Sequence, residues 1–73
     1  MSPDPADRIE FQPIAAAGHH IHCYVDRYYV ARITLHGDHC AIDGAGLVPC
    51  RVPNEDEARE VVRMWVRLRE NAM

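Results

Sequence analysis

Hydrophobic and polar residues alternate between residues 19 and 43, which is typical of β-strands that bury one face of a sheet. Within this stretch, the dipeptide Gly37-Asp38 is a signal for a two-residue hairpin turn of the primed type. A turn at this point pairs His36 with His39 across two strands. The pairs that follow along the same strands are Leu35 with Cys40, Ile33 with Ile42, and Arg32 with Asp43.

A second turn is predicted over residues 26–28, where the sequence is Asp-Arg-Tyr. This turn pairs Val25 with Tyr29 and Cys23 with Ala31. A shift of the pairing by one residue would mix apolar and polar side chains on both faces, which a half-buried sheet does not tolerate. One face is therefore expected to carry Ile21, Cys23, Val25, Tyr29, Ala31, Ile33, Leu35, Cys40 and Ile42.

The opposite face of these strands is expected to stay open, because one helix covers only one side of a sheet. It takes alternate residues of the histidine-rich hexapeptide GHHIHC at 18–23, and Tyr28 in the turn is expected on the same side. This face is expected to carry His20, His22, Tyr24, Val30, Arg32, Thr34, His36, His39 and Asp43.

The residues from Asn54 onward predict an amphipathic helix. Asn54 is a favoured N-cap residue, Glu57 completes a capping box, and the acidic first turn suits the positive end of the helix dipole. The apolar residues at helical spacing are Ala58, Val61, Val62, Trp65, Leu68 and Ala72. We expect this stripe to cover the apolar face of the sheet, with Trp65 largely buried against Ile33 or Leu35.

Weaker signals flank the central strands. Residues 1–8 read as a flexible tail, residues 8–14 as a weak strand that Pro13 restricts to an edge, and residues 47–52 as a short further strand. The predicted fold class is α+β, with a three- to four-stranded antiparallel meander and one C-terminal helix packed on one face. Residues 9–73 then form a single β-β-β-α domain.

Size and composition limit the possible functions. The chain has 73 residues, 48% of them hydrophobic, and a formal net charge of −3. So short a chain forms one domain with limited burial, and a partner subunit often supplies the rest. The charge argues against a general nucleic-acid binder. The sequence has neither a membrane-spanning apolar run nor the features of a secretory signal, so we expect a cytoplasmic protein without a membrane partner.

The histidines of the open face raise the question of a metal. His20, His36 and His39 lie close enough in the predicted sheet to converge on zinc. Their spacing matches no zinc-binding motif, however, and His22 lies beside Arg32, whose charge repels a cation. We therefore favour a histidine-rich surface that binds no metal or other cofactor.

The three cysteines do not suggest a disulfide or a catalytic thiol. Cys23 and Cys40 lie on strands with another strand between them, which is too far apart for a disulfide. Both point toward the predicted core and are interpreted as small buried hydrophobic residues. Cys50 is the cysteine most open to solvent, and the sequence places no histidine beside it as a base.

Three arginines form a secondary patch on the helix. Arg59, Arg63 and Arg67 recur every four residues and would suit a phosphate or an acidic partner. Each arginine has a carboxylate of the same helix within reach, so a solvated, self-paired surface is the favoured interpretation. These carboxylates are Glu55 and Asp56 for Arg59, Glu60 for Arg63 and Glu70 for Arg67.

The open face is the main functional candidate, because it mixes aromatic, histidine and arginine residues with few carboxylates, as protein interfaces do. We expect a small bacterial protein that acts as a non-enzymatic interaction module. An origin from a phage is an open alternative. The module would form a homodimer or bind or inhibit a larger protein. The sequence offers no acid pair, Ser-His or Cys-His arrangement to place in a cleft. The predicted interaction residues are His20, His22, Tyr24, Val30, Arg32, His36 and His39.

A nucleic-acid-binding or antitoxin-like regulatory domain that uses the same face is the alternative. The order of three strands and a helix resembles the sheet-reading DNA-binding modules of plant transcription factors and of integrase arms. The sequence NEDEAR at the helix start resembles the small antitoxins of the HicB type, over about the last two thirds of the chain. The proline- and glycine-bearing motif of those antitoxins is missing. Arg32, opposite Asp43, is the one arginine on the face, which favours a protein partner.

Histidine changes its charge between pH 5 and 8. If the open face self-associates, protonation of its four histidines beside Arg32 adds like charge. Association is then expected to weaken as the pH falls through about 6.5, the ordinary histidine value. If the histidines are only solvated, the molecular mass will not respond to pH.

Overall fold

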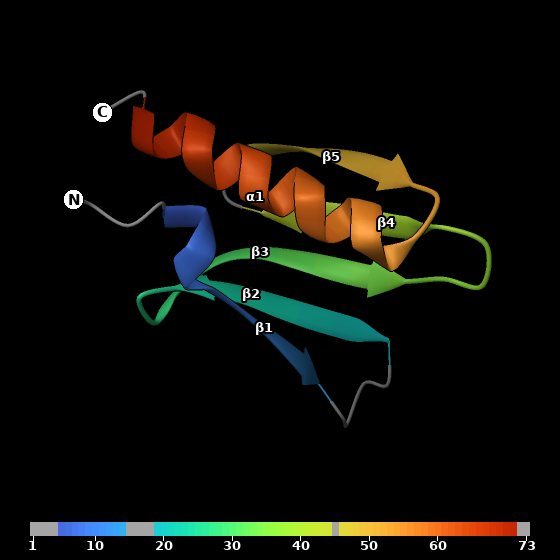
Figure 1. Cartoon of the computed structure of the whole chain (residues 1–73). Helices are drawn as coiled ribbons and strands as arrows, with labels where there is room; N and C mark the ends of the chain where they lie inside the picture. The colour runs from blue at the N-terminus through green and yellow to red at the C-terminus, as the bar shows by residue number, and fades with distance from the viewer. Residues whose placement is uncertain (1–4, 15–18, 45, 72–73) are drawn as a thin grey trace.

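An antiparallel sheet of five strands carries one helix across one of its faces (Figure 1). The computed structural model describes residues 5–14, 19–44 and 46–71. Each strand pairs with the next along the chain, so the predicted α+β meander with a C-terminal helix is confirmed, with five strands instead of three or four. The elements are η1 (Pro5–Arg8), β1 (Ile9–Ile14), β2 (His20–Val25), β3 (Tyr28–Leu35), β4 (Cys40–Gly44), β5 (Leu47–Val52) and α1 (Glu55–Asn71).

The covered face of the sheet forms the core together with α1, which packs against β3, β4 and β5. The alternation of apolar residues predicted most of this face correctly, and Leu35 packs at its margin. The confirmed buried residues of the strands are Ile21, Cys23, Val25, Ala31, Ile33, Cys40 and Ile42.

Helix α1 begins as predicted. The backbone N–H of Glu57 donates to Oδ1 of Asn54 at 2.9 Å, and the backbone N–H of Ala58 donates to the carbonyl oxygen of Asn54 at 3.1 Å. The N–H of Glu57 has no acceptor within the helix and is satisfied by the Asn54 side chain, while the N–H of Ala58 makes the first bond of the helix to the Asn54 carbonyl, so Asn54 is the N-cap.

The side of α1 that meets the sheet is rotated from the predicted stripe. Its buried residues are Ala58, Val62 and Val66, which recur every four residues. Leu68 is 66% exposed, so its assignment to the stripe is wrong. Trp65 is only partly buried, at the edge of the core beside Gly46, rather than largely buried as predicted. Ala72 lies outside the described residues.

The hairpin between β3 and β4 has the predicted register. The backbone N–H of His36 donates to the carbonyl oxygen of His39 at 2.9 Å, which closes the turn at Gly37-Asp38. Neither turn residue has a positive φ, so the predicted primed turn type is wrong. The predicted pairs of Leu35 with Cys40, Ile33 with Ile42, and Arg32 with Asp43 are all present.

The hairpin between β2 and β3 differs from the prediction. Its turn is Asp26-Arg27, and both residues have positive φ angles, 50° and 74°, as a two-residue primed turn requires. Val25 therefore pairs with Tyr28 rather than with Tyr29. A β-bulge beside Cys23 then restores the predicted register for the rest of the hairpin.

The bulge exchanges the faces of two residues. Val30 is 6% exposed and belongs to the core, whereas Tyr29 is 45% exposed on the opposite face. Both assignments were therefore wrong, because a bulge inserts one residue and reverses the alternation beyond it. The carbonyl oxygen of Val30 occupies the position where a Cβ at Gly44 would stand, so a glycine is required on the neighbouring strand.

The segment before β1 is ordered where the structure describes it. Residues 5–8 form the 3₁₀ helix η1, which packs against α1, and Ala6 is 3% exposed. Arg8 forms an ion pair with Asp26 at 3.5 Å. The part of the predicted flexible tail that the structure describes, residues 5–8, is therefore helical, and Ala6 in it is buried. Residues 1–4 lie outside the described part of the chain.

Candidate functional site

The face of the sheet opposite α1 is called the open face. The strand register arranges its side chains in rows that cross the sheet. The first row is Ile14, His20, Thr34, Ala41 and Arg51; the second is Gln12, His22, Arg32 and Asp43; the third is Glu10, Tyr24 and Tyr29. His36 and His39 lie beyond the first row, at the end of the β3–β4 hairpin.

Three rings in mutual contact form the aromatic cluster of the open face: His22, Tyr24 and Tyr29. The ring centroids of His22 and Tyr29 are 5.5 Å apart, and those of Tyr24 and Tyr29 are 6.0 Å apart, both in edge-to-face geometry. Such geometry is favourable between rings, so each ring holds the orientation of its neighbour. Burial raises the pKa of Tyr29 above its ordinary value, so its hydroxyl stays protonated and can donate a hydrogen bond.

An ion pair lies beside the aromatic cluster. Nη2 of Arg32 donates to Oδ2 of Asp43 at 3.0 Å, and this hydrogen bond raises the pKa of Arg32. The side chains of both residues are 43% exposed. Nε of Arg32 is buried and has no hydrogen-bond partner within the described residues. The guanidinium is therefore oriented by one carboxylate.

The remaining histidines of the open face each have a defined neighbour. Nδ1 of His20 lies 3.2 Å from the hydroxyl oxygen of Thr34 on the next strand. The rings of His36 and His39 stack, with centroids 4.5 Å apart. Nδ1 of His39 donates to a carboxylate oxygen of Asp38 at 2.6 Å, and this bond lowers the pKa of Asp38.

The candidate zinc ligands His20, His36 and His39 are not brought together. Across residues 5–14, 19–44 and 46–71, no three His, Cys, Asp or Glu side chains gather as metal ligands would. His20 is directed to Thr34, while His36 and His39 face each other. These three histidines therefore contact a threonine hydroxyl or another histidine ring, and they do not converge on one point.

The cysteines occupy the positions predicted for them. Cys23, Cys40 and Cys50 are all free thiols, and the first two are buried. Burial raises the pKa of Cys23 to about 12 and raises the pKa of Cys40. Both side chains therefore remain thiols at neutral pH and are weak nucleophiles.

The arginine patch on α1 is engaged within the molecule, as the self-paired interpretation predicted. Arg59 forms an ion pair with Glu55 at 2.8 Å, and Arg63 forms one with Glu60 at 2.9 Å. The guanidinium groups of both arginines also lie over the ring of Phe11, at 4.6 and 5.4 Å from its centroid. These two arginines therefore pack over β1. Arg67 is exposed.

Sequence reasoning placed most of the predicted interaction residues on the open face but missed two contributors and misplaced two others. Tyr29 and Arg51 were missed, whereas Val30 is in the core. Tyr28, 77% exposed, pairs across the β2–β3 hairpin with Val25, which is buried, so it lies on the helix side and not on the open face. Gly44 was the available signal, because a glycine within a strand often marks a close backbone approach.

Comparisons of the chain with protein-family models, with curated proteins and with solved structures find no match in any of the three. Among the described residues, no helix combines the length and the apolar character needed to cross a membrane.

Proposed function

We propose that this protein is a non-enzymatic binding module that holds a partner protein on its open face. The aromatic cluster is the observation that carries the proposal. Its three rings contact one another in tilted or edge-to-face geometry on the sheet, on the side opposite the helix that closes the core. Rigid aromatic side chains lose little conformational entropy on binding, so they are effective anchors at interfaces.

The surroundings of the aromatic cluster support a protein partner. The ion pair of Arg32 with Asp43 supplies charge of both signs next to the rings. His20 and Thr34 add polar groups that can donate or accept hydrogen bonds. An aromatic centre with a polar border is the usual composition of a protein interface.

The buried thiols support a non-enzymatic function. A cysteine nucleophile needs a lowered pKa, whereas burial raises the pKa of Cys23 and of Cys40.

A nucleic-acid ligand is the second candidate, and the aromatic cluster favours it too, because bases stack on aromatic side chains of exposed sheets. The charge of the face opposes it. Arg32 is paired with Asp43, Arg51 stands at the far strand, and the whole chain carries a net charge of −3. Binding of labelled single-stranded DNA and RNA, followed by fluorescence anisotropy at low salt, tests this candidate.

Two adjacent tyrosines allow a matched test of the protein-partner proposal. Tyr29 belongs to the aromatic cluster, whereas Tyr28 is more exposed and lies on the helix side. A partner captured from the native host is purified, and its affinity is measured by calorimetry for wild type, Tyr29→Ser and Tyr28→Ser. We expect Tyr29→Ser to weaken binding by about tenfold or more, as loss of an aromatic anchor does, and Tyr28→Ser to change it by less than about twofold. The reverse order would refute the proposal.

The homodimer predicted for the open face remains a prediction. Sedimentation at pH 8 and pH 5.5, with EDTA present, tests whether association weakens as the histidines gain protons. A dimer that survives acid unchanged would place self-association elsewhere on the molecule.

A further inference from the structure

One flank of α1 carries apolar side chains that the core covers only in part or leaves exposed. This apolar flank comprises Val61, Met64, Trp65 and Leu68, which follow one another at helical spacing. Met64 is 54% exposed and Leu68 is 66% exposed, while Val61 and Trp65 are partly buried. Two exposed apolar residues beside two partly buried ones on one side of a helix, in a chain of 73 residues, suit a docking surface.

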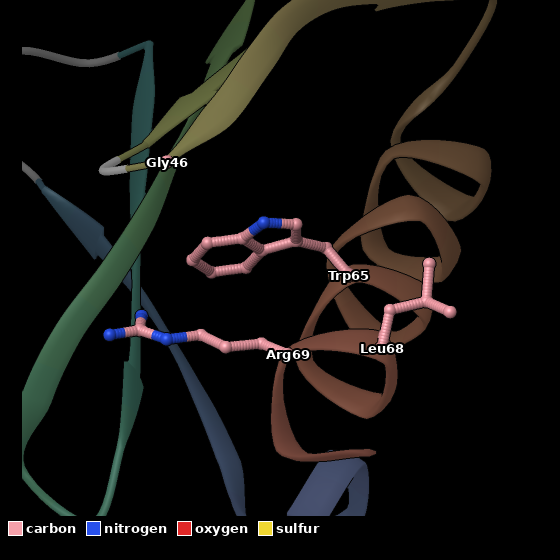
Figure 2. A pocket seen from close by; sticks show the side chains of 4 residues that line it. All are labelled: Gly46, Trp65, Leu68 and Arg69. Atoms are coloured by element: carbon pink, nitrogen blue, oxygen red, sulfur yellow. The ribbon is translucent and has the colours of Figure 1, made fainter. Parts of the chain in front are cut away.

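A recess lies beside the apolar flank. A cavity of about 550 Å³ is lined by Gly46, Trp65, Leu68 and Arg69. Figure 2 shows Trp65 and Arg69 reaching side by side from α1 toward the sheet, while Leu68 points away from it. Val48, two residues after Gly46, is 81% exposed. The recess is large enough to receive an apolar side chain such as leucine or methionine from another molecule.

The charges at the two ends of α1 indicate what that molecule is. The first turn is acidic, and its Glu57 lies one turn before Val61 on the same side of the helix. The last turn contains Arg69, followed in the sequence by Glu70, and the guanidinium of Arg69 lies 5.4 Å from the centroid of the Trp65 ring. The apolar flank therefore lies between the carboxylate of Glu57 and the guanidinium of Arg69.

We propose that a second copy of the chain docks against the apolar flank, with the two helices antiparallel about a twofold axis. Such an axis places the same surface of both copies in contact. It brings the Glu57 end of each helix beside the Arg69 end of the other, so both ends are paired with opposite charge. A parallel pair would place like charges together. Leu68 and Met64 of each copy then reach the recess of the other copy.

The interface leaves both open faces accessible, because α1 lies on the opposite side of the sheet. A dimer of this kind presents two copies of the aromatic cluster. The inference rests on the helix flank alone and stands or falls independently of the function proposed for the open face.

Sedimentation velocity of the full chain tests the proposal. The expected species has twice the chain mass of 8.3 kDa. Leu68 and Met64 are both exposed, so the variants Leu68→Glu and Met64→Glu should keep the fold. Each substitution is expected to weaken dimerisation by about a hundredfold or more. Tyr28→Ser, at an exposed aromatic position outside the apolar flank, should leave the mass unchanged.

Charge reversal tests the antiparallel arrangement. Glu57→Arg and Arg69→Glu should each weaken dimerisation by about tenfold, and the double variant should recover most of the affinity, because the interaction of the two sites is not additive. Circular dichroism confirms that each variant is folded. A wild-type chain that is monomeric at about 0.5 mM, where even a weak dimer would be populated, overturns the proposal. So does a dimer that Leu68→Glu leaves intact, or one that only Tyr29→Ser disrupts.

Discussion

The two faces of the sheet are built from alternate residues of the same strands but have opposite physical properties. The covered face carries branched or small apolar side chains, and Ile33 and Ile42 at its centre are 0% and 1% exposed. The open face carries rings and charged groups that touch one another and remain partly exposed. Stability is therefore expected to depend on the covered face, which leaves the residues of the open face available for binding.

The largest difference is expected between neighbours on β3. Ile33→Ala removes a fully buried side chain and should lower the free energy of unfolding by about 2–5 kcal/mol. Thr34→Ala, one residue later on the open face, removes only the contact with His20 and should cost less than about 1 kcal/mol. Urea denaturation of both variants measures the two values. Equal losses would mean that both faces contribute to the core.

The next largest effect concerns the bulge that exchanges Tyr29 and Val30. Gly44→Ala places a methyl group against the carbonyl oxygen of Val30, so we expect a loss of about 1–3 kcal/mol from overpacking. Gly37→Ala is the control, because a Cβ at Gly37 meets nothing within 4 Å, and it should stay within about 0.5 kcal/mol of wild type. Thermal unfolding compares the pair, and equal stability of the two variants would argue against the bulge.

How far the sequence predicts each hairpin depends on its turn. Gly37-Asp38 allows one obvious two-residue turn, so the alternation around it fixes the register as far as Asp43. Asp26-Arg27 contains no glycine, and its positive φ angles could not be inferred from the residues themselves. The following Tyr-Tyr-Val is equally suited to either face of a strand.

The helix shows a similar limit. Its start was predictable from local chemistry, because Asn54 caps the backbone of its own first turn. Its rotation about its axis was not, since Val66 and Leu68 are both apolar and the packing against η1 and the sheet decides which one is buried. The aromatic cluster was predicted in part, through His22 and Tyr24.

A smaller effect is expected at the cap of the helix that closes the covered face. Asn54→Ala removes the acceptor for the N–H of Glu57 and should cost about 1 kcal/mol. Asn54→Ser retains a capping oxygen and should lower the free energy of unfolding by only about a few tenths of a kcal/mol. Urea denaturation measures both values, provided that the variants and the wild type share the same dependence of unfolding free energy on urea concentration. A urea midpoint of Asn54→Ala equal to that of the wild type would mean that the cap does not stabilise α1.

The smallest effect belongs to the rim of the open face. The hydrogen bond from His39 holds the pKa of Asp38 below its ordinary value, so the carboxylate contributes stability above that value and loses it as the pH falls through the lowered one. Asp38 is exposed, and salt will weaken the effect further. Carbon-detected NMR titration should show the Asp38 carboxyl moving back toward an ordinary pKa in His39→Gln. An Asp38 titration that is the same in both proteins would contradict the contact.

The central claim is that the open face, and not the helix side, holds the partner protein. The most direct test is an NMR titration of the side-chain ring signals as purified partner is added. We expect the signals of His22, Tyr24 and Tyr29 to shift or broaden at saturation, while those of Tyr28 and Trp65 keep their positions. Movement of the Tyr28 and Trp65 signals with the aromatic cluster unchanged would contradict the account.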